Sequence, residues 1–190
     1  MDKILAGFRK IGRAAFSTGE YSALLGRRGY ARVALHRLKK RGKIENAKRG
    51  WWAFANSTPE EVACTISAPA YLSFHSALHM HGLTTQIPRT IQVAVARNAK
   101  KYEISGNHVA EYKIRPEHFN NYEAKDGVLL ATPEKALADC LNVPRACTKT
   151  VLLEAAEQVD LKKAEWFLTR TGKKRLKQLE KELKKARKND

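Results

Sequence analysis

The chain has 190 residues, enough for one or two ordinary domains, and its 43% hydrophobic and 8% aromatic content is typical of a globular protein. Thirty-six Lys and Arg against 19 Asp and Glu give a formal net charge of +17, which exceeds what solubility requires and predicts a polyanionic partner. No apolar run reaches the roughly 18 to 20 residues that cross a bilayer, and the amino-terminal stretch lacks the apolar block of a secretory signal. We therefore expect a cytoplasmic protein with no membrane partner.

The charge is concentrated at the two ends of the chain. Residues 1–55 hold fourteen Lys or Arg and three acids, a net of +11, and residues 170–190 hold ten bases and three acids, a net of +7. The residues between carry twelve bases and thirteen acids, a net of −1. The pattern predicts three segments: 1–57, 58–169 and a basic helix over 170–190.

Two helices are predicted before residue 27. Apolar residues recur at helical spacing and indicate a first helix that runs to about Phe16. Ser17 and Thr18 are suited to cap a short second helix that ends at Gly26. The apolar stripe of the first helix consists of Ile4, Leu5, Phe8, Ile11 and Ala15.

The third predicted helix, 28–41, has one apolar and one basic face. Gly42 ends it after a basic last turn, which the helix dipole favours. Two short strands, 43–47 and 51–55, then form a hairpin with a basic tip, and of Trp51 and Trp52 one should pack on the helices while the other faces outward. The core-facing residues of the helix are expected to be Ala31, Ala34, Leu35 and Leu38.

Three helices followed by a hairpin are the order of a winged helix-turn-helix domain. A helix about 10 to 12 Å across fits the DNA major groove, where Arg side chains reach guanine O6 and N7, while the hairpin meets phosphate or the minor groove. A basic face that is merely solvated is the simpler alternative, but a net of +11 on 55 residues favours binding of double-stranded DNA. The candidate DNA-binding residues are Arg27, Arg28, Tyr30, Arg32, His36, Arg37, Lys40, Lys48 and Arg49.

The sequence pattern of the middle segment, 58–169, predicts a mixed α+β domain. Helices are indicated from Thr58-Pro59, which begins a capping box, from about Ser73 to Gly82, and from Thr132-Pro133. Strand-like runs lie at 90–96, 109–114 and 127–131, without the regular βα alternation of a nucleotide-binding fold. The buried stripe of the helix after Thr132 is expected to hold Ala136, Leu137, Cys140 and Leu141.

Histidines and cysteines are the residues of this segment with metal-binding potential. His75 and His79 share a helical face at i and i+4, but Ser76 replaces the Glu of an HExxH motif, so His75, His79 and His81 are expected to pack and to form hydrogen bonds. Asp139 is likewise expected to make a structural hydrogen bond. We expect no catalytic residue, no metal and no cofactor.

The three cysteines are Cys64, Cys140 and Cys147. Their odd number and the absence of CxxC spacing indicate neither a disulfide framework nor a zinc module. They are expected to be small buried hydrophobes or free thiols.

The C-terminal segment has an apolar stripe of Leu176, Leu179 and Leu183 at i, i+3 and i+7. The stripe could dock on the rest of the chain, pair with a second copy or follow a phosphate backbone. A coiled coil usually needs about three or more heptads, so docking is favoured.

Several segments, taken in order over residues 16–141, resemble AbiEi-type antitoxins, which are transcriptional regulators of viral-defence toxin-antitoxin operons. They are the helix-turn-helix around GlyArgArgGlyTyr at 26–30, the aromatic strand after Arg49-Gly50, the run 73–83 before Ile87-Pro88, the strand 90–96, and 131–139. The resemblance implies an α+β fold with an N-terminal winged helix-turn-helix, an antitoxin-like domain and, in this chain, a basic C-terminal helix.

The resemblance also implies a function. The winged helix would repress the protein's own operon, and the rest of the chain would oppose an AbiEii-type nucleotidyltransferase toxin, which is the enzyme of the pair. A homodimer or cooperative binding on the DNA operator is an open expectation. The alternatives are a stand-alone transcription factor or RNA-binding protein, and a metal-dependent nucleic-acid enzyme that uses His75, His79 and Asp139.

Overall fold

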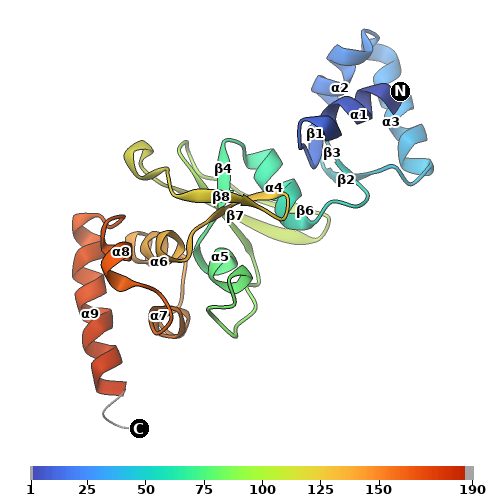
Figure 1. The fold of residues 1–190 in the computed structure, drawn as a ribbon. Coiled ribbons are helices and arrows are strands. Elements are labelled where there is room, and N and C mark those ends of the chain that lie inside the picture. The colour runs from blue at the N-terminus through green and yellow to red at the C-terminus, as the bar shows by residue number, and fades with distance from the viewer. Residues whose placement is uncertain (1, 187–190) are drawn as a thin grey trace.

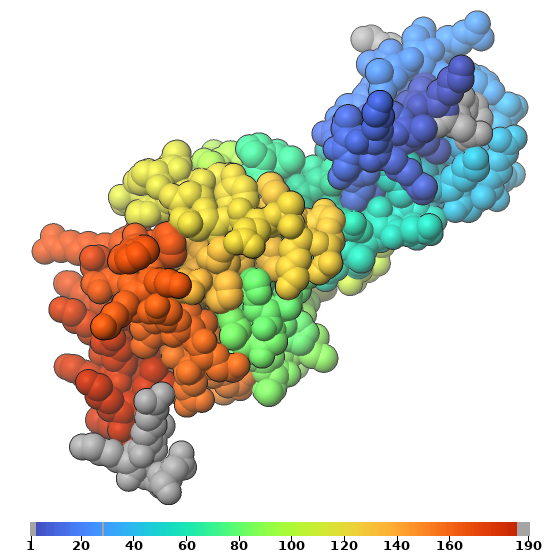
Figure 2. Space-filling view, viewed as in Figure 1, coloured from blue at the N-terminus to red at the C-terminus, as the bar shows by residue number. Residues whose placement is uncertain are grey.

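The computed structural model describes residues 2–186, with the side chains of Asp2, Arg28 and Ala186 left out, and shows an α+β protein. Residues 2–55 form what we call the N-terminal unit, a separate lobe in the space-filling view (Figure 2). Residues 58–186 form the body. The expected C-terminal segment is described only as far as 186.

The N-terminal unit contains three helices and a three-stranded antiparallel sheet with the strand order β1-β3-β2. Its elements are α1 (Asp2–Lys10), β1 (Ala15–Ser17), α2 (Thr18–Leu25), α3 (Arg28–Lys40), β2 (Ile44–Lys48) and β3 (Trp51–Phe54).

The prediction that the first helix runs to Phe16 is wrong. Helix α1 ends at Lys10, and Gly12 follows with a φ of 70°, a left-handed conformation that suits glycine and turns the chain. Ala15 and Phe16 instead pair with Ala53 and Trp52 in the sheet. Strand β1 has only three residues, too few to show a strand pattern in the sequence. Its Ala15 therefore looked like a continuation of the apolar stripe of the helix.

The predicted caps of α2 and the buried stripe of α3 are confirmed, whereas Ile11, predicted on the apolar stripe of the first helix, lies beyond the end of α1 and is 69% exposed. Ser17 and Glu20 form a capping box at the start of α2, and Gly26 ends α2 in the left-handed conformation. The indole of Trp52 donates a hydrogen bond of 2.9 Å to Thr18 Oγ1. The apolar stripe of α3 is at most 1% exposed and belongs to a core with α1, β1 and β3: Ala31, Ala34, Leu35 and Leu38.

The body is a six-stranded mixed sheet with the order β6-β7-β5-β4-β9-β8. Helix α4 covers one face, while α5 and α6 lie on the other (Figure 1). Its strands are β4 (Ala70–Leu72), β5 (Ile91–Val95), β6 (Lys101–Ile104), β7 (Asn107–Lys113), β8 (Tyr122–Lys125) and β9 (Val128–Ala131). Its helices are α4 (Pro59–Ser67), α5 (Phe74–Met80), η1 (Pro116–His118), α6 (Pro133–Asn142), α7 (Lys149–Ala156), α8 (Leu161–Glu165) and α9 (Arg170–Ala186).

Three strands of the body were not predicted: β4, β6 and β8. The short β4 lies between β5 and β9 and is buried along its whole length, so it shows no alternation of apolar and polar residues. The edge strands β6 and β8 are mostly exposed and polar. Neither kind of strand shows the alternation of Ile91, Val93 and Val95 that marked β5 in the sequence.

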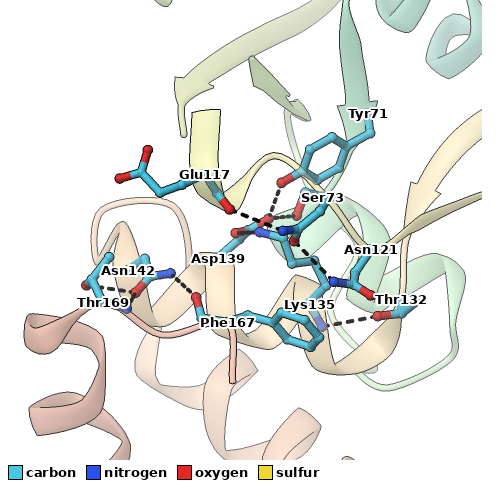
Figure 3. Close-up of polar contacts among 11 residues, drawn as sticks. Tyr71, Ser73, Glu117, Asn121, Thr132, Lys135, Asp139, Asn142, Phe167 and Thr169 are labelled. Carbon is cyan, nitrogen blue, oxygen red and sulfur yellow. Dashed lines mark hydrogen bonds and ion pairs between the residues drawn. The ribbon is translucent and has the colours of Figure 1, made fainter. Parts of the chain in front are cut away.

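Helix α6 packs against α5, α7, α8 and α9 and carries a buried ion pair. Lys135 and Asp139 form an ion pair with no exposed surface, and Tyr71 and Ser73 donate hydrogen bonds of 2.9 and 2.8 Å to the Asp139 carboxylate (Figure 3). The structural role expected of Asp139 is therefore confirmed. The helix also begins at Thr132, as predicted, with the hydroxyl accepting from the backbone N–H of Lys135.

The prediction that all cysteines are unpaired is wrong. Cys140, near the end of α6, and Cys147, in the loop that follows, form a disulfide with their Cα atoms 5.6 Å apart. The loop brings the two residues together although their spacing matches no motif. Cys64 is a free thiol.

Helix α9 docks on the body, as its leucine stripe predicts. Leu176, Leu179 and Leu183 are 4 to 6% exposed and lie against α6 and α7. Arg175 donates to the main-chain oxygens of Leu141 and Asn142 at the C-terminal end of α6, where the helix dipole favours a cation. The C-terminal segment is thus part of the body. Within residues 2–186, no helix is long and apolar enough to span a membrane.

Gly172 provides a test of how tightly α9 docks. A Cβ at this position would lie 2.3 Å from Asn142 Oδ1, an atom that is fixed by hydrogen bonds from Thr169 N and Oγ1. We predict that Gly172→Ala lowers the unfolding free energy by about 1 to 3 kcal/mol, measured by urea denaturation. Gly7→Ala is the control: nothing lies within 4 Å of that Cβ, and alanine in an exposed helix should stabilise by about 0.5 to 1 kcal/mol. Equal effects of the two substitutions would contradict the docking geometry.

Candidate nucleic-acid interface

The exposed side of α3 is a basic face of the N-terminal unit. Residues 21–44 contain no Asp or Glu, so no acid on α3 or on its flanking turns offsets this charge. The apolar stripe at 31, 34, 35 and 38 turns the remaining positions outward. The exposed residues of the face are Tyr30, Arg32, Val33, His36, Arg37, Lys39 and Lys40.

Within this face Tyr30 and Arg37 hold each other in place. They are two helical turns apart, and Arg37 Nη1 donates a hydrogen bond of 2.6 Å to the Tyr30 hydroxyl. The guanidinium also lies 5.7 Å from the centroid of the Tyr30 ring. An exposed Arg that is held in one orientation loses less conformational entropy when it binds an anionic partner.

Val33 was not among the predicted site residues, although it is 45% exposed in the middle of the basic face. Its position opposite the apolar stripe was the available signal. An apolar side chain among cations, as Val33 is, is suited to contact a thymine methyl group.

His36 lies with its ring edge toward Trp52, with 5.9 Å between the ring centroids.

At the N-terminal end of α3, Arg27 is exposed and its side chain makes no capping hydrogen bond. The side chain of Arg28, another predicted site residue, lies outside the part of the chain that the structure describes.

The two predicted basic residues of the β2–β3 hairpin point in different directions. Arg49 is exposed beside Gly50, as the prediction requires. Lys48 instead packs against the body, with its ammonium 3.9 Å from the centroid of the Tyr102 ring, and burial lowers the pKa of Lys48. Because β6 of the body lies against the hairpin, Lys48 does not project freely from its tip, and the predicted contact of Lys48 with DNA stays a prediction.

Trp51, like Lys48, packs against the body. It is half-buried against the body, while Trp52 is 6% exposed in the core of the N-terminal unit. The alternation of the two tryptophans is confirmed, but the outward one meets protein rather than solvent.

A backbone hydrogen bond joins the hairpin to the body, and a polar network lies beside this contact within the body. The Ser105 N–H donates to the Ala47 oxygen at 3.0 Å, and the Tyr102 hydroxyl lies 2.6 Å from Ser67 Oγ. Ser67 in turn donates to Glu111, whose side chain is 1% exposed and accepts two hydrogen bonds from Arg97. Burial would raise the pKa of Glu111, but the donors from Arg97 and Ser67 outweigh burial and lower it.

The three histidines of α5 and its end act separately. His75 Nε2 lies 2.8 Å from the Gln86 oxygen, and His81 Nε2 lies 2.8 Å from the Ala131 oxygen, which are the structural roles predicted for them. His79 Nδ1 is buried and has no hydrogen-bond partner among residues 2–186. Over the same residues no three His, Cys, Asp or Glu side chains come together as a metal site would require.

Comparisons with known proteins identify no family. No family model matches the chain, and no curated protein matches it. The fold is similar to the crystal structure of the RV2827C protein from Mycobacterium tuberculosis, with 15% identity and a TM-score of 0.48 over 90% of this chain and 76% of that one.

The acid dependence of stability tests the Glu111 network. A folded-state pKa below the ordinary value of 4.5 means that the stabilisation is complete above pH 4.5 and is lost as the pH falls through the folded pKa. We predict that Glu111→Gln lowers the unfolding free energy at pH 7 by about 1 to 3 kcal/mol and flattens its fall between about pH 5 and 3.

The control is Glu123→Gln, which changes an exposed carboxylate on the edge strand β8. Urea denaturation at each pH gives the comparison. If the two variants had the same pH dependence, the hydrogen bonds and ion pair of Glu111 would not supply the acid-sensitive part of the stability.

Proposed function

We propose that the protein is a sequence-specific DNA-binding repressor whose N-terminal unit is a winged helix-turn-helix domain, with α3 as the recognition helix. The single observation that carries the proposal is the acid-free basic face of α3 beside a three-stranded sheet in the order β1-β3-β2. The function is binding rather than catalysis. Its ligand is double-stranded DNA, since a helix of about 10 to 12 Å diameter enters the major groove.

The division of charge supports this orientation. Residues 1–55 carry a net charge of +11, against −1 for residues 56–169. The phosphate backbone therefore attracts the N-terminal unit more strongly than it attracts residues 56–169. Arg32 and Arg37, which are both exposed on α3, would read base edges. Arg49 at the hairpin tip is placed to contact phosphate, whereas Lys48 is occupied by Tyr102.

We further propose that the protein is an antitoxin that opposes a nucleotidyltransferase. This second half rests on the resemblance of residues 16–141 to AbiEi-type antitoxins. Its observable consequence is the rescue of cells that express the toxin.

The recognition helix is tested by Arg32→Ala and Arg37→Ala. Loss of an Arg contact to a base edge should cost about 1 to 3 kcal/mol and relax the sequence preference at that base. Fluorescence anisotropy on the promoter of the protein's own gene measures both. Arg145→Ala, an exposed Arg in the loop after α6, is the control and should change the affinity little. Unchanged affinity in both α3 variants, with the fold intact, would reject α3 as the recognition helix.

The hairpin is tested by comparing Arg49→Ala with Lys48→Met. A phosphate contact releases counterions, so Arg49→Ala should weaken binding to all sequences and reduce the slope of log affinity against log salt by about 1. Lys48→Met should leave this slope unchanged and lower the unfolding free energy by about 0.5 to 1 kcal/mol, because it removes a cation from an aromatic ring. The reverse assignment of the two effects would contradict the geometry of the hairpin.

The antitoxin half is tested by co-expression with a nucleotidyltransferase encoded next to this chain. We expect growth arrest by the nucleotidyltransferase alone and recovery when the full chain is present. The Arg37→Ala variant should still rescue, since the α3 face is assigned to DNA. No rescue, or the absence of such a gene, would favour the stand-alone regulator.

A further inference from the structure

A basic pocket is lined by residues of α6 and α9, among others. These two helices lie at the end of the body away from the N-terminal unit (Figure 1). The pocket is an open hollow with a volume of about 360 Å³, lined by the end of β7, by η1, by the C-terminal end of α6 and by the first turn of α9. We call it the α9 pocket. The basic side chains that line it are Lys113, Arg115, His118, Arg170 and Arg175.

The positive charge of the α9 pocket is not neutralised locally. None of the described residues that line it is Asp or Glu. Arg115 lies 3.8 Å from Glu117, but the two side chains are 75% and 60% exposed, so this ion pair contributes little. Arg175 donates to neutral carbonyl oxygens at the end of α6. Like charges that converge in one hollow repel each other, and a bound anion relieves this repulsion.

The wall between α6 and α9 is held rigidly. Asn142 accepts hydrogen bonds of 2.9 Å from both the N–H and the hydroxyl of Thr169, and it donates one of 3.0 Å to the Phe167 oxygen (Figure 3). Gly172 is buried against the same side chain. Arg170 and Thr171 are therefore presented on a fixed helical turn, which lowers the entropy that binding must overcome.

The chemistry of these groups selects phosphate among anions. Arginine forks match phosphate oxygens with paired hydrogen bonds, and a phosphate monoester carries up to two negative charges, against one for a carboxylate. The volume exceeds that of one phosphate and falls within the range of sites for small organic ligands, roughly 300 to 1,000 Å³.

We propose that the α9 pocket binds a dianionic phosphate group, either of a free nucleotide or at the end of a polynucleotide strand. The binding is separate from that of the α3 face, because different elements at different ends of the molecule form the two surfaces (Figure 2). Failure of operator binding by α3 would leave it untouched.

Isothermal titration of the full chain at low salt tests the proposal. The probes are inorganic phosphate, AMP, and a short single strand with and without a 5′-phosphate. We expect saturable binding of one phosphate-bearing probe per chain. AMP binding as tightly as the phosphorylated strand assigns the free nucleotide, whereas tighter binding of the strand that depends on its 5′-phosphate assigns the polynucleotide end.

The pocket variant is Arg115→Gln with Arg170→Gln, and it should weaken binding at least about tenfold. The control, Lys177→Gln with Lys181→Gln, removes the same charge from exposed positions of α9 that do not line the pocket, and should stay within about twofold. Thermal unfolding without ligand checks that each variant folds, and Arg115→Gln alone provides a second, milder variant. The proposal is overturned if no probe binds saturably, or if the control weakens binding as much as the pocket variant.

Discussion

Strand β3 belongs to two hydrophobic cores at once, and the placement of the basic face depends on it. Because successive side chains of a strand point to opposite faces, Trp52 and Phe54 enter the core of the N-terminal unit, while Trp51 and Ala53 lie on the body. Its neighbour β1 repeats the pattern, with Phe16 in the first core and Ala15 in the second. The sheet therefore joins the two lobes through packing as well as through the chain.

This shared sheet limits what each lobe can do alone. The N-terminal unit has its own core, but one face of its sheet lies against α4 and β6 of the body. A shift of the body would move the hairpin through Lys48 and Tyr102 and through the Ala47–Ser105 hydrogen bond. The hairpin is thus held by residues far from the α3 face as well as by its own unit.

Local signals in the sequence predicted much of this arrangement. The cap at Ser17 and the capping box at Thr58 placed the starts of two helices correctly, and the stripes of α3 and α9 identified their buried faces. These features depend on residues within a few positions of one another. The contacts that depend on distant segments were not predicted: β1 needs β3, Lys48 needs Tyr102, and the Cys140–Cys147 bridge needs the loop after α6. The exposed side of α3 was predicted well because it is the complement of an apolar stripe, while the direction of each basic side chain at the hairpin was not.

The central claim is that the α3 face reads a DNA sequence, beyond attracting phosphate. The most direct measurement is a titration of the full chain against its own promoter fragment and against a shuffled fragment of equal length and composition, at near-physiological salt. The account predicts a preference for the promoter of at least about 10³-fold, as for specific protein–DNA complexes. Equal affinity for the two fragments, with the same dependence on salt, would contradict it and reduce the basic face to a nonspecific polyanion contact.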